Sequence, residues 1–112
     1  MPECLFCRIV AREIPAQLVH EDADTVAFKD IDPKAPTHVL VVPKKHIESL
    51  SSSVDEDALV LGKVMRAAAK VASSLGLESY RVAVNNGRGA GQTVFHVHYH
   101  LLGGRPLLWP PG

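Results

Sequence analysis

The chain has 112 residues, and its twelve basic and twelve acidic side chains leave a formal net charge of zero. This length predicts one domain over residues 1–112, and a hydrophobic content of 46% is typical of an ordinary soluble globular protein. Because non-specific binding to nucleic acid depends on excess positive charge, the neutral balance argues against a nucleic-acid partner.

The N-terminal segment shows no export signal. Residues 1–13 carry charges where a signal peptide needs an uninterrupted apolar stretch. The longest apolar run, over residues 38–43, has the length of a strand and falls well short of the ~20 residues that span a membrane. We therefore expect a cytoplasmic protein with no membrane partner.

The first part of the chain predicts one short helix and three strands. The helix is expected over residues 5–12 and ends before Pro15, because the residue before a proline disfavours helical geometry. Residues 17–21 and 25–30 are expected to form a hairpin. Residues 38–42 are rich in β-branched side chains and predict a buried strand.

A long helix is the clearest element. Ser53 and Glu56 have the spacing of a capping box, and Gly76 is suited to end the helix. Apolar residues recur every three or four positions and predict one stripe that faces the core. The stripe consists of Val54, Ala58, Leu61, Met65, Ala68, Ala72 and Leu75.

Two further strands are expected, over residues 80–85 and 94–102, separated by a glycine-rich loop over residues 86–92. Several strands with one long helix, and without regular βαβ alternation, predict an α+β domain.

Three histidines alternate along the last predicted strand, at His96, His98 and His100. Alternate residues of a strand point to one face, roughly 6–7 Å apart. Three imidazoles in a row suit a plain core poorly, because each ring needs hydrogen-bond partners. Two chemistries fit the row: a zinc centre with an open position for water, or nucleophilic catalysis by imidazole. A polar sheet face that happens to hold histidines is the structural alternative.

The glycine-rich loop precedes this row. Gly87, Gly89 and Gly91 allow sharp turns, and successive amide groups can form an anion-binding nest. No Gly-Lys-Ser/Thr follows, and a strand rather than a helix comes next, so neither the Walker motif nor the dinucleotide fingerprint applies. The loop is compatible with a phosphate cradle and equally with an ordinary turn.

Cys4 and Cys7 are the only cysteines. Their spacing is that of half a zinc site, which would need two further ligands. A redox pair and two buried thiols are the alternatives.

The segment Gln92-Thr93-Val94-Phe95-His96-Val97-His98-Tyr99-His100-Leu101-Leu102 resembles the signature of the histidine triad (HIT) family. Other segments are similar to the Hint branch of that family, and the resemblance covers almost the whole chain. These segments are Phe28-Lys29-Asp30-Ile31, Ala35-Pro36-Thr37-His38, Val42-Pro43-Lys44-Lys45-His46-Ile47 and Trp109-Pro110-Pro111-Gly112.

The resemblance implies an antiparallel sheet with one long helix and a short N-terminal helix, and a homodimer through which the sheet continues. It also implies a purine nucleotide, AMP-like, bound beside the histidine row. Hint-type members hydrolyse nucleoside phosphoramidates, such as AMP joined to an amine, through a nucleotidyl-histidine intermediate.

Matched by position, the resemblance assigns roles to individual residues. His98 is the implied nucleophile, supported by His38. His100, Asn85 and the backbone of Gly91, Gln92 and Thr93 would hold the phosphate. Asp30 would bind the ribose hydroxyls, and Phe28 and Ile31 would line the base pocket. Thr93 stands where Hint-type members commonly have serine, and its hydroxyl could relay a proton to the leaving amine.

Related family members with the same Cys-x-x-Cys suggest that His46 and His96 complete a structural zinc site with Cys4 and Cys7. His96 would then be a metal ligand and not part of the catalytic set. The sequence leaves two other functions open: a zinc-dependent hydrolase that uses the histidine row, and a nucleotide-binding or interaction module without turnover.

Overall fold

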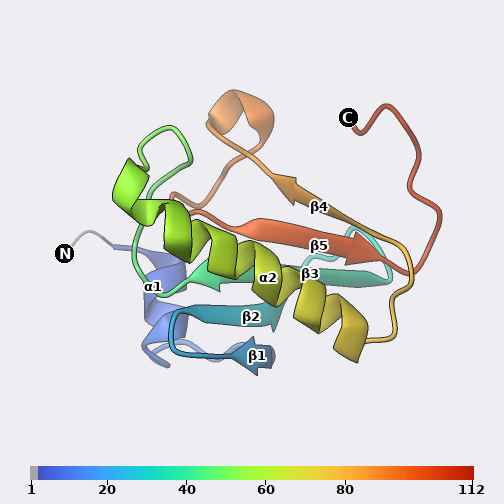
Figure 1. Ribbon diagram of the computed structural model, residues 1–112, viewed down its shortest axis with the longest axis horizontal. Helices are drawn as coiled ribbons and strands as arrows, with labels where there is room; N and C mark the ends of the chain where they lie inside the picture. Colours follow the sequence, from blue (N-terminus) through green and yellow to red (C-terminus); the bar gives the residue numbers. More distant parts are fainter. Residues whose placement is uncertain (1–2) are drawn as a thin grey trace.

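The computed structural model describes residues 3–112, which form one five-stranded sheet with a helix on each face (Figure 1). In chain order the elements are α1 (Leu5–Val10), β1 (Leu18–Glu21), β2 (Thr25–Lys29), β3 (Thr37–Pro43), the 3-10 turn η1 (Asp55–Asp57), α2 (Ala58–Ser74), β4 (Tyr80–Val84), the 3-10 turn η2 (Arg88–Ala90) and β5 (Tyr99–Gly103). The predicted α+β fold class, with an antiparallel sheet, one long helix and a short N-terminal helix, is confirmed. Within the described range, neither helix is both long and apolar enough to cross a bilayer.

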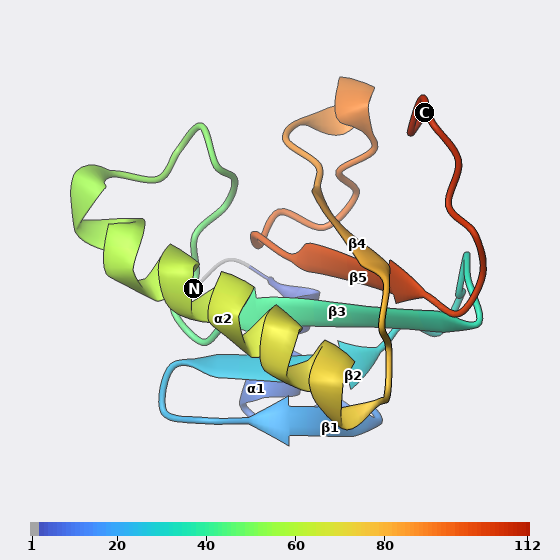
Figure 2. The same cartoon turned by 45° about the vertical axis from the view of Figure 1, so that its right-hand side comes forward.

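The strand order is β1-β2-β3-β5-β4, and every neighbouring pair is antiparallel. The last strand, β5, therefore lies between β3 and β4, which precede it by many residues (Figure 2). This arrangement pairs His100 of β5 with Leu40 of β3 on one side and with Ala83 of β4 on the other. The sheet thus brings the histidine segment beside the strand that carries His38.

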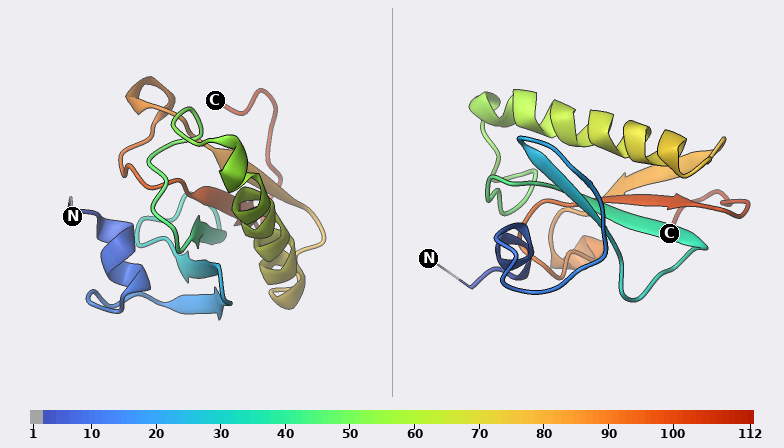
Figure 3. Two further views of the ribbon diagram at one scale, coloured as in Figure 1. Left: turned by 60° about the vertical axis from the view of Figure 1, so that its left-hand side comes forward. Right: turned by 90° about the horizontal axis from the view of Figure 1, so that it is seen from below.

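The two helices cover opposite faces of the sheet (Figure 3). Alternation along β3 separates two cores, since Val39 and Val41 pack on the α2 side whereas Leu40 and Val42 pack on the α1 side. Phe6 and other residues of α1 close the second core. The α1 side is the face on which the functional residues gather.

The start of α2 differs from the prediction. The side chain of Asp57 accepts a hydrogen bond from the amide of Val54 at 2.9 Å, whereas the Ser53 hydroxyl donates to the carbonyl of Leu50. The predicted Ser53–Glu56 capping box is therefore wrong, because the 3-10 turn η1 inserts before the helix. Gly76 does follow the helix end with a φ of 74°, as predicted.

The buried face of α2 is also rotated from the predicted stripe. Val54, Met65 and Leu75 are 55%, 46% and 42% exposed, so these members of the stripe do not face the core. The residues that do are Val64, Ala67, Ala68, Val71 and Ala72. A face made largely of alanine and valine lets the helix lie close to the sheet, which favours this rotation over one led by longer side chains.

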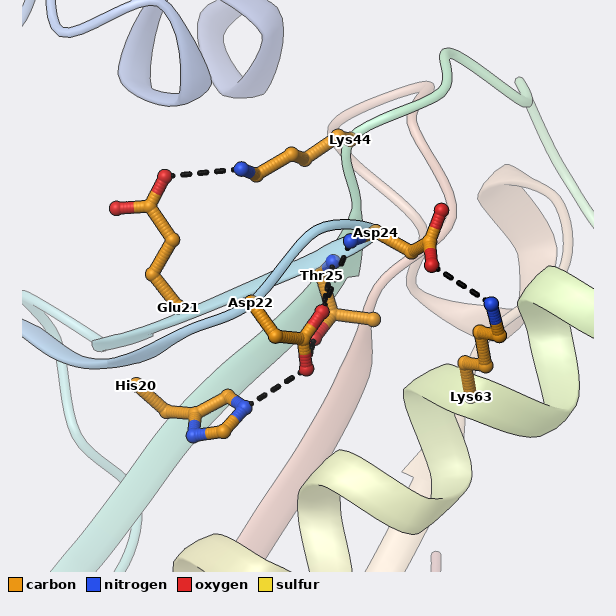
Figure 4. Close-up of polar contacts among 7 residues, drawn as sticks. All are labelled: His20, Glu21, Asp22, Asp24, Thr25, Lys44 and Lys63. Atoms are coloured by element: carbon orange, nitrogen blue, oxygen red, sulfur yellow. Dashed lines mark hydrogen bonds and ion pairs between the residues drawn. The ribbon is translucent and has the colours of Figure 1, made fainter.

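The hairpin of β1 and β2 is closed by Asp22 (Figure 4). Its Oδ1 accepts hydrogen bonds from the amides of Asp24 and Thr25, and its Oδ2 accepts one from the Thr25 hydroxyl at 2.7 Å. An ion pair between Asp24 and Lys63 at 2.8 Å then joins the turn to α2. The hairpin predicted over residues 17–30 is confirmed, and its side chains fix it to the rest of the fold.

Candidate active site

The histidine segment is only partly a strand. The ladder of β5 begins at Tyr99, so the predicted strand over residues 94–102 is too long at its start. The alternation nevertheless holds: Val97, Tyr99 and Leu101 enter the α2-side core, and His98 contacts Phe6 on the α1 side. Without the regular ladder, His96 is free to turn into a separate cluster described below.

Two adjoining cavities meet at the histidines. The apolar cavity has a volume of about 360 Å³ and is lined chiefly by apolar side chains, with His98 and His100 at one end. The polar cavity has a volume of about 550 Å³, and Asp32 and Lys34 are among the residues that line it. Both volumes lie in the range of small-molecule sites. The lining residues shared by the two cavities are Asp30, Gly91, Thr93 and His100.

His98 is held in one tautomer. Its Nδ1 lies 2.8 Å from the carbonyl oxygen of His96, and because a carbonyl only accepts, Nδ1 carries the hydrogen. Burial lowers the pKa of His98, so the ring is neutral near pH 7. The lone pair of the neutral ring is therefore on Nε2. This is the nitrogen that a nucleophilic histidine needs free.

His100 is fixed by a chain of hydrogen bonds. The amide of Lys34 donates to Nδ1 of His38 at 3.0 Å, so the hydrogen of a neutral His38 is on Nε2. That Nε2 lies 2.9 Å from Nδ1 of His100 and donates to it. The hydrogen of His100 is therefore on its own Nε2, a buried atom without a partner among the described residues. His100 thus presents an uncompensated donor beside both cavities.

The same chain of hydrogen bonds decides whether His38 can bind a metal ion. Ligand atoms of Asp30, His38 and His100 lie within 4.8 Å of one another. Because Nε2 of His38 carries a hydrogen, it has no lone pair for a metal ion. Burial lowers the pKa of His100 to about 4 and also lowers the pKa of His38, so both rings act as neutral hydrogen-bonding groups. The hydrogen bond of His38 is to His100, whose ring centroid lies 4.9 Å from that of His98, so the support of His98 by His38 that the resemblance implies would be indirect.

The residues expected to bind the nucleoside lie around the apolar cavity. Phe28 is buried and meets the ring of Phe6 edge-on at 5.3 Å between centroids. Ile31 also lines this cavity, but it is 99% exposed and so lies at the rim. Asp30 stands where the two cavities join, with Oδ1 accepting from the amide of Asp32 at 2.8 Å.

The glycine-rich loop places Asn85, Gly91 and Thr93 along the polar cavity. Gly87 and Gly91 have φ values of 88° and 96°, a region that favours glycine. The amide of Gly91 donates to the carbonyl of Arg88, and that of Gln92 donates to the carbonyl of Gly87. Those two amides are therefore already used inside the loop, so of the two possibilities left open by the sequence, they fit an ordinary turn better than an open nest.

Gln92 faces the protein interior rather than either cavity. It is 1% exposed, and its Oε1 accepts from the amide of Gly87 at 2.8 Å. Its Nε2 donates to the carbonyls of Glu48 and Val94. The side chain fastens the loop to the segment that precedes α2, so any part it plays at the site is indirect.

The four residues expected to bind zinc converge on one point. Nδ1 of His96 lies 3.4 Å from Sγ of Cys4 and 3.5 Å from Sγ of Cys7, and 3.3 Å from Nδ1 of His46. The Cys7 and His46 ligand atoms are 3.3 Å apart. Tetrahedral zinc with usual bond lengths requires S···N and N···N separations of about 3.5 Å and about 3.3 Å. The donor atoms present fit such an ion.

The surroundings of this cluster also suit a cation. Nε2 of His96 donates to the carbonyl of Pro43 at 2.8 Å, which leaves the lone pair of the ring on Nδ1 inside the cluster. Burial and the hydrogen bond with Cys4 raise the pKa of Cys7 to about 11 in the protein alone, and a bound metal ion would favour its thiolate. The Nδ1 atom of His96 therefore faces this cluster and not the pair formed by His38 and His100.

Two residues that shape the site, Lys34 and Phe6, were not predicted from the sequence. Lys34 acts through its backbone amide, which no side-chain pattern reveals. Phe6 meets the ring of His98 edge-on, with centroids 5.0 Å apart and an angle of 87°. The only signal for Phe6 was its place in the short predicted helix between the two cysteines.

Comparisons with known proteins identify the family of the chain. The family model described as "HIT domain" matches residues 11–107. The crystal structure of a HIT family hydrolase from Legionella pneumophila has a TM-score of 0.96 and 48% identity, and the match covers 98% of this chain and 100% of that one. A HIT family hydrolase from Clostridium thermocellum has a TM-score of 0.93 and 45% identity, and the match covers 96% of each chain. Protein HitA of Neisseria gonorrhoeae is 46% identical over 104 residues, 92% of this chain and 97% of that protein.

Proposed function

The chain belongs to the HIT family, and from this premise we propose that it is a Hint-type nucleotide hydrolase that cleaves purine nucleoside phosphoramidates. The bond broken is the phosphorus–nitrogen bond between an AMP-like nucleotide and an amine. The observation that carries the proposal is the state of His98: its Nδ1 is engaged by the His96 carbonyl, and the ring is neutral with its lone pair on Nε2.

The reaction has two displacements. Nε2 of His98 attacks phosphorus, the phosphorus–nitrogen bond breaks, and the amine departs with the electron pair and takes up a proton. Water then attacks the same phosphorus and loses a proton, and the bond to Nε2 breaks, which releases the nucleotide and restores the neutral ring. An uncharged nucleophile suits this chemistry because a negative one would be repelled by the phosphoryl oxygens. The Nε2 hydrogen of His100 supplies a donor for charge on those oxygens.

The two cavities define the orientation of the bound substrate. The base is placed in the apolar cavity near Phe28, and the ribose hydroxyls near Asp30. Phosphorus then lies close to Thr93 and His100, which border both cavities. The amine is proposed to leave toward the polar cavity, which His98 does not line, as an in-line displacement requires. Thr93 is the hydroxyl suited to pass a proton to the amine.

The cluster of Cys4, Cys7, His46 and His96 is proposed to hold a structural zinc ion. Bound zinc would cross-link α1 to the segments that carry the two histidines and would take no part in the displacements. The four donors close a tetrahedral set on their own, so no position is kept for water or substrate.

A homodimer is proposed as the assembled form. In the sheet order, β4 has a free edge, and α2 exposes Met65 beside its buried face. A second copy that pairs with β4 would satisfy the unpaired strand edge and continue the sheet. Sedimentation of the protein at twice the 12.1 kDa chain mass is the expected result, and a single-chain mass would contradict this part of the proposal.

The function is tested by turnover of adenosine 5′-phosphoramidate by the wild type and by His98→Ala. We expect the variant to lose at least ~100-fold in rate, because the covalent step is removed. A nucleotide trapped on His98 after alkaline quench, stable in base and released in acid as expected of a phosphorus–nitrogen bond, should accompany wild-type turnover. A zinc-dependent hydrolase that uses the histidine row would instead lose all activity when the metal is stripped, and it would form no nucleotide adduct on His98. A binding module would show neither turnover nor adduct.

A further inference from the structure

Phe6 occupies a position shared by the two sites. It lies on the first turn of α1, between Cys4 and Cys7, and is 4% exposed. Its ring contacts that of His98 at a centroid distance of 5.0 Å with an angle of 87°, and that of His96 at 6.0 Å and 69°. One buried ring therefore touches the proposed nucleophile and a proposed metal ligand.

The contact restrains a motion that the hydrogen bond of His98 leaves open. The bond from Nδ1 to the carbonyl of His96 fixes the position of one ring atom, but it allows the ring to tilt about that point. Phe6 closes one side of the ring, and His100, whose centroid is 4.9 Å from that of His98, closes another. Edge-to-face contacts between rings favour a defined angle as well as a distance.

We propose that Phe6 is a positioning residue that aligns Nε2 of His98 with phosphorus, and that it makes this alignment depend on closure of the cysteine–histidine cluster. Cys4 and Cys7 flank Phe6, and the amide of Cys7 donates to Sγ of Cys4 at 3.3 Å, so the turn that carries Phe6 is built on the cluster. Opening the cluster releases the turn, and the ring of His98 loses its support. The inference rests on the proposed function.

The effect on rate follows from geometry. A displacement of about 1 Å at a reacting group can cost ~100-fold in rate, even when the altered residue does no chemistry. Phe6 also lines the apolar cavity, so its loss affects nucleotide binding as well. The diagnostic quantity is therefore kcat, which binding of the base alone does not set.

The experiment compares Phe6→Ala and Phe6→Leu with Ile9→Ala as a matched control. Ile9 lies on the same helix, is 8% exposed and lines the same cavity, but it makes no ring contact with His98. With adenosine 5′-phosphoramidate, Phe6→Ala should lower kcat at least ~10-fold, whereas Ile9→Ala should raise KM and change kcat less than ~3-fold. Phe6→Leu, which keeps most of the volume, should recover part of the lost kcat. Phe6→Leu also tests the proposal if Phe6→Ala does not fold.

The dependence on the cluster is read from a double-mutant cycle with Cys7→Ser. If Phe6 transmits the closure of the cluster, the double variant loses less kcat than the product of the two single losses. Zinc content is measured on every variant, and Phe6→Ala should retain the zinc of the wild type. Losses that multiply would overturn the coupling, and so would loss of zinc in Phe6→Ala.

A readout independent of turnover is the ¹⁵N spectrum of the His98 ring. The wild type should show one sharp set of resonances for the Nδ1–H tautomer. Phe6→Ala should keep this tautomer, because the bond to the His96 carbonyl remains, but should show shifted or broadened resonances as the ring tilts. A wild-type kcat and an unchanged spectrum in both Phe6 variants would overturn the inference and leave the proposed function intact. A wild type that never turns over the phosphoramidate would contradict the proposed function, and the spectra would still decide the role of Phe6.

Discussion

Nε2 of His38 donates a hydrogen bond to Nδ1 of His100 across 2.9 Å, and this bond decides which nitrogen of His100 carries its hydrogen. The direction is set one step earlier, because the amide of Lys34 occupies Nδ1 of His38. The result is an Nε2–H on His100 beside the cavities. Removal of His38 frees His100 to take the other tautomer, which presents a lone pair to the phosphoryl oxygens.

We therefore predict that His38→Ala lowers kcat for adenosine 5′-phosphoramidate by ~10–100-fold, somewhat less than the ~10²–10³ lost with a complete oxyanion donor. His38→Gln is the matched control, since its amide group can donate to Nδ1 of His100, and it should stay within ~5-fold of the wild type. Steady-state kinetics measure both. Equal losses in the two variants would mean that His38 acts through packing and not through the hydrogen bond.

The stability of the protein should depend on the protonation of the same pair. Burial holds the pKa of His100 at about 4 in the folded state, below its usual value of 6.5, and also lowers the pKa of His38. Between about pH 6.5 and pH 4 the unfolded chain binds a proton at His100 and the folded chain does not, and the lowered pKa of His38 acts in the same direction. Stability is therefore full above pH 6.5 and is lost as the pH falls through this window.

The free energy of unfolding is predicted to fall by up to ~1.4 kcal/mol per unit decrease in pH for each such group. Urea unfolding at pH 7.0, 6.0 and 5.0 measures it. His100→Asn removes one of the groups and should flatten the dependence by about that amount. His20→Asn is the control, because His20 is a surface histidine paired with Asp22. A His100→Asn slope identical to that of the wild type would show that His100 titrates normally.

Metal removal is expected to weaken the fold and to slow the reaction without taking away its nucleophile. Cys4 and Cys7 hold α1 to His46 and His96, so chelation should lower the melting temperature and increase hydrogen exchange in α1. Cys4→Ser should reproduce the shift and reduce zinc content from one ion per chain. Unchanged melting after chelation, with no metal in the isolated protein, would contradict the assignment.

The sequence predicted the elements of this fold well where local pattern and tertiary packing agree. The β-branched run of β3 and the Asp22 turn each specify their structure locally. The cluster residues could be named because the family resemblance supplied His46 and His96, which lie far from the cysteines in the chain. The pattern of α2 was right for Ala68 and Ala72 and wrong for Met65 and Leu75. Two apolar stripes overlap on that helix, and only the sheet beneath it selects the one with Val64 and Val71.

Other features of the site had no signal in the sequence. The tautomers of His38 and His100 depend on the backbone amide of Lys34. Nearly every residue of a protein has such an amide, so the sequence gives no sign of which one acts. The ladder of β5 begins only at Tyr99, opposite Val41, although β3 continues to Pro43, and His96 leaves the row in the irregular stretch before Tyr99. Gln92 could be named as a site residue, but whether its side chain turned outward or inward depended on the loop around it.

Gln92 should therefore act on the reaction through the loop. Its amide group joins Gly87, Glu48 and Val94, three backbone positions from separate segments. Gln92→Met keeps the size of the side chain and removes every one of these hydrogen bonds. Because buried polar groups left without partners cost about 1–3 kcal/mol each, we predict a loss of ~2–4 kcal/mol in unfolding free energy.

The same substitution should loosen the loop that brings Thr93 to the cavities, so kcat/KM for adenosine 5′-phosphoramidate is expected to fall ~10-fold. Faster hydrogen exchange at the Gly87 amide, now unpaired, should accompany this fall. Asn86→Ala is the matched control, since it removes one exposed hydrogen bond of the same loop, from the Ser51 amide at 2.8 Å, and should cost about 1 kcal/mol or less with kcat/KM unchanged. If Gln92→Met keeps its kcat/KM while the Gly87 amide exchanges faster, the loop does not position Thr93, and the hydroxyl proposed to serve the leaving amine must come from elsewhere.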